Sequence, residues 1–130
     1  MVTDSCGAGK WRGGLGIARS YRLLAPEAGL QLRADRMKIL PYGLEGGGPA
    51  TGAINEIETQ AGDSLILPSK INRRMLEGDL VRHVQPGGGG FGNPLERDPE
   101  RVALDVWNTK ITAKYARKYH KVVVDNATGA

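Results

Sequence analysis

Cysteine, aromatic residues and long apolar runs are scarce in this 130-residue chain, and each scarcity excludes a class of protein. The single cysteine, Cys6, allows no disulfide within the chain. No apolar run is long enough for a signal sequence or a membrane span, which predicts a chain with no membrane partner. Together these absences predict a reducing, cytoplasmic setting.

The chain also shows no recognisable arrangement of residues that could catalyse a reaction without a partner. The two histidines, His83 and His120, are far apart in the sequence, and no partner stands at zinc-site or catalytic-triad spacing. Glu56 and Glu58 share one face of an expected strand, but without an apolar pocket they are interpreted as solvated. The sequence therefore predicts no catalytic set and no metal site in this chain alone. A metal shared with a partner, with His83 or Cys6 as one ligand, stays open.

Glycine, by contrast, is abundant, with 19 of 130 residues, and it is gathered in clusters. The segment Gly7–Lys10 suggests a Walker phosphate loop, but Asp4 stands where that motif needs a glycine, and Trp11 where it needs a hydroxyl. Residues 87–92 match G-x-G-x-x-G, yet Asn93-Pro94 follows where that motif opens a helix. We therefore interpret the clusters as loops that either pack closely on other backbone or contact a ligand. The structural glycines predicted in these loops are Gly13, Gly14, Gly46, Gly47, Gly88, Gly89 and Gly90.

The net charge of +4 comes from one short segment near the C-terminus. Between Thr109 and Val124 no acid occurs, and the basic residues are Lys110, Lys114, Arg117, Lys118 and Lys121. At about 100° per residue they fall on one helical stripe, with Ile111, Tyr115 and Tyr119 beside it facing the core or a partner. The stripe is either a solvated helix face or a docking surface for an acidic protein patch or phosphate groups. Because the rest of the chain is nearly neutral, we expect no nucleic-acid partner, and a basic RNA-binding β-barrel is the weaker alternative.

Short apolar segments separated by turn residues predict a mainly β domain, a small barrel or sandwich of short antiparallel strands with one or two C-terminal helices. Strands are expected at Leu15–Leu24, Leu30–Asp35, Ile54–Thr59, Leu65–Leu67 and Leu80–Val84. The first is predicted to be half buried, with Ile17, Tyr21 and Leu23 on one face, and to pair with the second as a hairpin. In the second strand, the alternation places Leu30, Leu32 and Ala34 inward.

Helical signals begin at Asp98, which is predicted to cap a helix that has Pro99 at its first position. Its inward face is expected to contain Val102, Ala103, Val106 and Trp107. A second helix is predicted from Thr112 to about Tyr119. Residues 1–124 are predicted to form a single domain, with helices from about residue 98, and residues 125–130 a flexible tail.

Five stretches, in this order and spacing, resemble one known family. They are Gly7–Gly16, Arg33–Arg36, Pro41–Gly47, Leu67–Lys70 and Pro86–Glu100. The chain resembles the C-terminal region of the hydantoinase B, 5-oxoprolinase, and acetone and acetophenone carboxylase family. Each glycine motif is weak alone, but five in order make the resemblance specific. The chain departs from the family at His120, where the family usually has glycine after the tyrosine.

The resemblance implies a small subunit, because the family's chains are several hundred residues longer and have their metal and substrate residues mostly in the part that is missing here. As a separate chain it is similar to the small subunit of acetophenone carboxylase. The implied function is a non-catalytic subunit of an ATP-dependent ketone carboxylase, and the alternative is a subunit of an ATP-dependent hydantoinase- or oxoprolinase-type hydrolase. ATP and a divalent metal would be bound mainly by other subunits. The implied partners are larger hydantoinase A- and hydantoinase B-type subunits in an obligate hetero-oligomer.

The resemblance also indicates where the chain meets its partners. Arg12, Arg33 and Arg36 are candidates for contacts with phosphate or carboxylate groups at the interface, because guanidinium groups match these anions. The alternative is that Arg33 and Arg36 pair with Asp35 and nearby acids. The basic helical stripe adds three further interface candidates, which are Lys114, Arg117 and Lys118.

Overall fold

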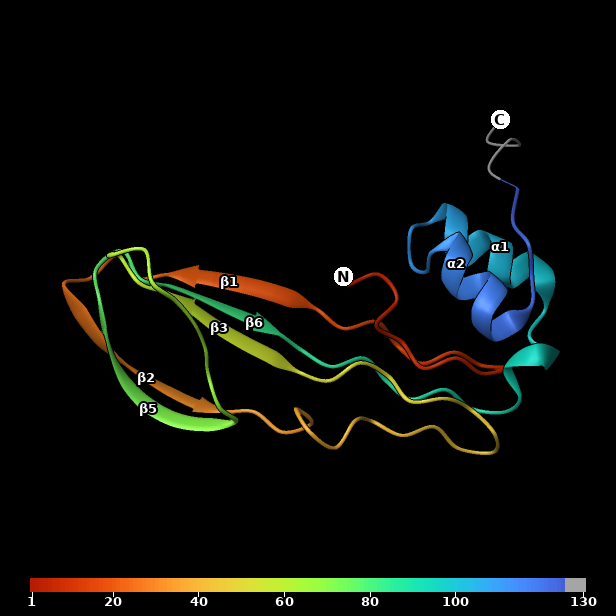
Figure 1. Ribbon diagram of the computed structural model, residues 1–130, viewed down its shortest axis with the longest axis horizontal. Coiled ribbons are helices and arrows are strands. Elements are labelled where there is room, and N and C mark those ends of the chain that lie inside the picture. The colour runs from red at the N-terminus through yellow and green to blue at the C-terminus, as the bar shows by residue number, and fades with distance from the viewer. Residues whose placement is uncertain (126–130) are drawn as a thin grey trace.

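The computed structural model describes residues 1–125 and shows an elongated molecule, with strands at one end and helices at the other (Figure 1). Long extended segments without regular secondary structure run side by side between the two ends. Within the described residues, no helix combines the length and the apolar character needed to cross a membrane. Of the tail predicted at residues 125–130, residues 126–130 lie outside the described range.

The strands form two separate antiparallel sheets. The larger sheet has the order β1-β6-β3-β4, with β1 at Ala18–Arg22, β6 at Leu80–Val84, β3 at Ile54–Glu58 and β4 at Ser64–Ile66. The smaller sheet pairs β2 at Glu27–Arg33 with β5 at Lys70–Leu76. The apolar core between the sheets contains the buried side chains of Ile57, Leu67, Met75 and Val81. The mainly β prediction is confirmed, and the two sheets correspond to the sandwich alternative.

The pairing predicted for the first two strands is wrong. β1 pairs with β6 and β2 pairs with β5, so the two segments lie in different sheets. The inward positions of the second segment are confirmed, because Leu30 and Leu32 pack against the core and Ala34 is buried. The first segment was expected to be half buried, but every residue of β1 is exposed. Alternation indicates which face of a strand is buried, but it does not specify the neighbouring strand.

The C-terminal end of the molecule is helical, as predicted. Its elements are η1 at Pro94–Glu96, α1 at Pro99–Trp107, α2 at Ala113–Tyr115 and η2 at Ala116–His120. Asp98 caps α1, because its side chain accepts a hydrogen bond from the backbone N–H of Glu100. Thr112 caps α2 in the same way, with Tyr115 as the donor. Both predicted helix starts are therefore confirmed.

The inward face of α1 matches the prediction at Val102 and at Val106, which packs against the core, and differs from it at Trp107. Val102 is fully buried as expected, but Trp107 is 56% exposed and the carboxylate-bearing Asp105 takes the inward position instead. Val102 and Asp105 are three residues apart, so they share one side of the helix. The side chain of Asp105 forms ion pairs with Arg12 and Arg97 in the interior, which makes its burial tolerable.

Candidate functional site

Glycine-rich backbone forms the middle of the molecule, where three extended segments, residues 7–16, 41–52 and 85–92, lie against one another. Backbone hydrogen bonds join all three: Gly7 N donates to Gly88 O at 2.8 Å, and Gly90 N donates to Gly48 O at 3.0 Å. A Cβ atom would fall between 1.8 and 2.1 Å from a backbone oxygen at four predicted glycines, which are Gly13, Gly47, Gly89 and Gly90. These contacts are backbone on backbone, so close packing is the role that the structure gives these four.

The other three predicted glycines differ. Gly46 has a φ of 87°, a backbone conformation that side chains rarely adopt. A Cβ on Gly88 would have Gly14 N as its nearest neighbour, at 3.2 Å. A Cβ on Gly14 would find no atom within 4 Å, so backbone packing does not explain that glycine.

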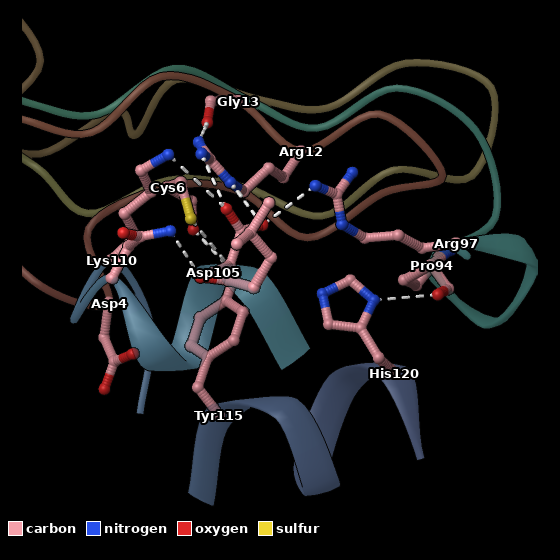
Figure 2. A network of polar contacts seen from close by, with 12 residues as sticks. Asp4, Cys6, Arg12, Gly13, Pro94, Arg97, Asp105, Lys110, Tyr115 and His120 are labelled. Carbon is pink, nitrogen blue, oxygen red and sulfur yellow. Dashed lines mark hydrogen bonds and ion pairs between the residues drawn. The ribbon is translucent and has the colours of Figure 1, made fainter. Parts of the chain in front are cut away.

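A buried carboxylate joins the helices to the glycine-rich segments (Figure 2). Asp105 on α1 accepts hydrogen bonds from Arg12 Nε at 2.7 Å, Arg12 Nη2 at 3.0 Å and Arg97 Nη2 at 2.8 Å. The Nζ atom of Lys110 is 3.9 Å from Oδ1 of Asp105, whose side chain is only 5% exposed. Burial alone would raise the pKa of Asp105, but the hydrogen bonds and charges of Arg12 and Arg97 outweigh it and hold that pKa below its ordinary value.

This network uses Arg12, one of the predicted anion-contact residues, within the chain itself. The Nη1 atom of Arg12 donates to Gly13 O, so the guanidinium is bound to internal acceptors on both sides. Arg97 likewise donates to Lys10 O at 3.0 Å. Asp105 and Arg97 were not predicted from the sequence. The sequence signal that could have revealed the buried carboxylate was the position of Asp105, three residues after Val102 and next to Val106, inside the apolar stripe of the helix.

Three further side chains near this network are buried, those of Cys6, Tyr115 and His120. Tyr115 Oη donates to Cys6 O at 2.7 Å and lies 3.9 Å from Cys6 Sγ. Burial raises the pKa of the Cys6 thiol, and burial together with Cys6 raises the pKa of Tyr115. His120 Nδ1 lies 2.8 Å from Pro94 O, and burial lowers the pKa of that imidazole. Cys6 therefore stays a thiol, which is the weakly nucleophilic form.

Arg33 and Arg36 are among the residues that line a hollow near the ends of β2 and β6. The hollow has a volume of about 410 Å³, and its lining includes Arg33, Asp35, Arg36, His83 and Gln85. Within residues 1–125, neither guanidinium forms an ion pair with a carboxylate, so the alternative that they pair with Asp35 and nearby acids is not observed. The two arginines were predicted from the sequence, but their proximity to His83 was not.

The basic helical stripe is smaller than predicted. Lys114, Arg117 and Lys118 lie on α2 and η2, whereas Lys110 precedes the helix and Lys121 follows it with a φ of 57°. The stripe of five was therefore wrong, because the helical segment begins only after Lys110 and ends before Lys121, whose backbone is left-handed. Ile111 and Tyr115 are buried as expected, while Tyr119 is 39% exposed and contacts the ring of Tyr115 at a centroid distance of 4.5 Å.

A comparison with known protein families shows to which family the chain belongs. The family described as hydantoinase B/oxoprolinase matches residues 1–94, more than half of the chain. The chain belongs to the hydantoinase B/oxoprolinase family. The resemblance inferred from the five sequence stretches is thus confirmed, and three of these stretches lie within or overlap the glycine-rich segments.

Relatives in this family include subunits of enzyme complexes. The chain is 42% identical to an uncharacterized protein of Methanocaldococcus jannaschii, over 93% of this chain and 21% of the relative. It is 36% identical to the B-type subunit of a putative D-/L-hydantoinase from a Pseudomonas species, over 92% of this chain and 20% of the relative. It is 30% identical to the acetophenone carboxylase delta subunit of Aromatoleum aromaticum, over 94% of this chain and 22% of the relative.

A solved structure gives the same relationship. The ATP-dependent caprolactamase of Pseudomonas jessenii superimposes with a TM-score of 0.80 at 27% identity, over 97% of this chain and 22% of that chain. This hydantoinase B-type chain therefore spans about a fifth of the length of the relatives it matches. In its described part, no group of three or more His, Cys, Asp or Glu residues is placed to hold a metal ion.

Proposed function

We propose that this chain is a small, non-catalytic subunit of an ATP-dependent ketone carboxylase complex. It adds the sandwich, the glycine-rich segments and the helices to a larger hydantoinase B-type subunit, which it completes. Larger hydantoinase A-type subunits are further members of the same obligate hetero-oligomer. Support comes from its similarity to the acetophenone carboxylase delta subunit, of which this chain matches 22% of the length.

The observation that carries this proposal is the amount of apolar side chain left in solvent. Leu24 is 81% exposed, Ile39 is 74% exposed and Tyr42 is 67% exposed. Trp11 and Phe91 pair across the glycine-rich segments and are each about half exposed. Isolated exposed apolar residues are ordinary, but apolar exposure along the whole length of a small chain is typical of a surface covered by a partner.

In the proposed reaction, the complex transfers a phosphoryl group from ATP to the enolate oxygen of a ketone, with release of ADP, and carboxylation of the enol phosphate with bicarbonate then releases inorganic phosphate. Other subunits bind ATP and the divalent metal. This chain shapes and stabilises the large subunit that holds the substrate.

A second candidate is a subunit of an ATP-dependent hydrolase that activates an amide-like carbonyl. The 36% identity with a hydantoinase B-type subunit and the fold shared with an ATP-dependent caprolactamase favour it. Both candidates give the chain the same supporting role, and they differ in the substrate and the reaction of the complex.

The test is purification of the tagged chain from its native cells, followed by mass spectrometry and activity assays of what co-purifies. We expect larger hydantoinase A- and B-type subunits, with ATP hydrolysis that depends on a ketone and bicarbonate. Dependence on a cyclic amide instead would select the hydrolase. Recovery of the chain without either large subunit contradicts the proposal.

A further inference from the structure

We propose that His120 is an acid-sensitive latch at the helical end of the molecule: its neutral imidazole holds η2 against η1, and uptake of a proton releases η2. His120 is the last residue of η2 and is only 4% exposed. Its Nδ1 atom lies 2.8 Å from the carbonyl oxygen of Pro94, the first residue of η1. The inference uses residues of this chain alone, so it holds whichever complex the chain joins.

The hydrogen bond to η1 fixes where the imidazole carries its proton. A carbonyl oxygen only accepts, so Nδ1 of His120 donates to Pro94 O, and Nε2 of the neutral ring keeps a lone pair. Nε2 is buried and has no hydrogen-bond partner within the described residues. Protonation would turn Nε2 into a donor without an acceptor. Because an unsatisfied buried group costs more when it is charged, this packing suits the neutral ring.

The charge around the imidazole also disfavours a further proton. Figure 2 shows the His120 ring beside Arg97 and the network of Asp105. Asp105 brings one negative charge, but Arg12 and Arg97 already pair with it, which leaves the buried group net positive. The ring of Tyr115 on α2 lies 6.1 Å from the imidazole, and its raised pKa keeps its hydroxyl neutral. Burial and the charge of Arg97 lower the pKa of His120, and they outweigh its hydrogen bond and the charge of Asp105.

The other charged side chains on the elements packed against η2 are paired elsewhere or exposed. Glu96 in η1 pairs with Lys10, and Arg101 in α1 lies over the ring of Trp11. The remaining charged residues of α1, its cap, α2 and η2 are exposed, and they are Asp98, Glu100, Lys114, Arg117 and Lys118. Within residues 1–125, the acid that acts on the imidazole is therefore Asp105, which is already paired.

The backbone of η2 is suited to release. The element is a five-residue π-helix, and Lys121, which follows it, has a φ of 57°. This left-handed conformation at a helix end is usually taken by glycine, so a lysine is held there at a cost. Ala116 at the start of η2 is fully buried in the cluster that contains Val102 and Ile111. Release of η2 therefore opens the apolar core of the helical end.

Acid opens the latch, and higher pH closes it. Because the folded pKa of His120 lies below the ordinary value of about 6.5, the open form binds the proton more tightly. The contribution of the latch is complete above about pH 6.5 and is lost as the pH falls through the lowered folded pKa. In this window the ratio of open to closed molecules should rise by at most about tenfold for each pH unit.

Amide hydrogen exchange of the full chain, compared at about pH 7.5 and about pH 5, measures the opening of η2. Each rate is divided by the intrinsic rate at the same pH. We expect the protection of residues 116–122 to fall by about threefold or more at the lower pH, while that of β3 and β6 is unchanged. The pKa of the His120 ring, measured by NMR, should lie below that of an exposed histidine. Unchanged protection of η2, or a ring pKa at or above about 6.5, overturns the proposal.

Two matched variants separate the latch from other effects of pH. In His120→Asn, the side-chain Nδ2 can still donate to Pro94 O but takes up no proton, so the protection of η2 should not depend on pH in this range. His83→Asn makes the same change at the other histidine and should keep the wild-type response. If η2 still opens with acid in His120→Asn, or if the response disappears in His83→Asn, another group is the switch and the proposal is wrong. Exchange and ring pKa of the wild type decide the question even if a variant fails to fold.

Discussion

Replacing the buried carboxylate of Asp105 by an amide should destabilise the fold far more than the same change at the surface. In Asp105→Asn the side chain keeps its shape, but the guanidinium groups of Arg12 and Arg97 lose their negative partner. The side chain of Arg97 is 8% exposed and that of Arg12 is 18% exposed, so water cannot replace the lost contacts fully. Removing one partner of a buried ion pair typically costs about 3–5 kcal/mol.

Urea unfolding followed by circular dichroism measures this cost against a matched control. Asp63→Asn makes the same chemical change at an exposed turn, where the expected effect is within about 0.5 kcal/mol. A typical domain of this kind has only about 5–15 kcal/mol of stability, so the Asp105 variant should shift the midpoint strongly. A loss below about 1 kcal/mol would refute the claim that this network anchors the helices.

The pH dependence gives a second check on the same reasoning. The folded pKa of Asp105 is held below the ordinary value of about 3.9, so its contribution is complete above that value. As the pH falls from about 4 through the lowered pKa, the carboxylate is protonated and the contribution is lost. The stability difference between wild type and Asp105→Asn should therefore shrink in this acidic window. A difference that stays constant down to about pH 2 contradicts the assignment.

Three further predictions follow from single contacts. Gly89→Ala should destabilise the chain by about 1–3 kcal/mol or more in urea unfolding, because the added Cβ would lie 1.8 Å from a backbone oxygen. Gly14→Ala should be neutral or slightly stabilising, because no atom lies within 4 Å of its Cβ. Equal effects of the two variants would contradict the packing argument. Asp98→Ala should cost about 1 kcal/mol by removing the α1 cap, with a correspondingly lower melting temperature, and no change would mean that the cap is unimportant. Cys6 should react with a thiol reagent only after denaturation, because the thiol is buried and burial raises its pKa. Rapid labelling of the native chain would show that the Cys6 thiol is accessible to solvent.

The candidate site could be predicted from the sequence only in part. Arg33 and Arg36 were identified from a local stretch, but His83, which lines the same hollow, lies about fifty positions away on a strand of the other sheet. Arg12 was expected to meet an external anion, and it meets Asp105 instead. No local pattern reveals which of two distant charged residues will face each other, because that depends on packing of the intervening chain.

The amino-acid sequence by itself determined the local features of this protein. The Asp98 and Thr112 caps, the inward alternation of β2 and the mainly β composition depend on interactions between residues a few positions apart. Family membership was also visible, because the glycine stretches keep their order. Tertiary structure alone decided the partners of β1 and β2, the burial of Asp105 and the stacking of glycine backbones. These features depend on contacts between distant segments, whose free energy comes from burial and charge pairing that only the assembled chain provides.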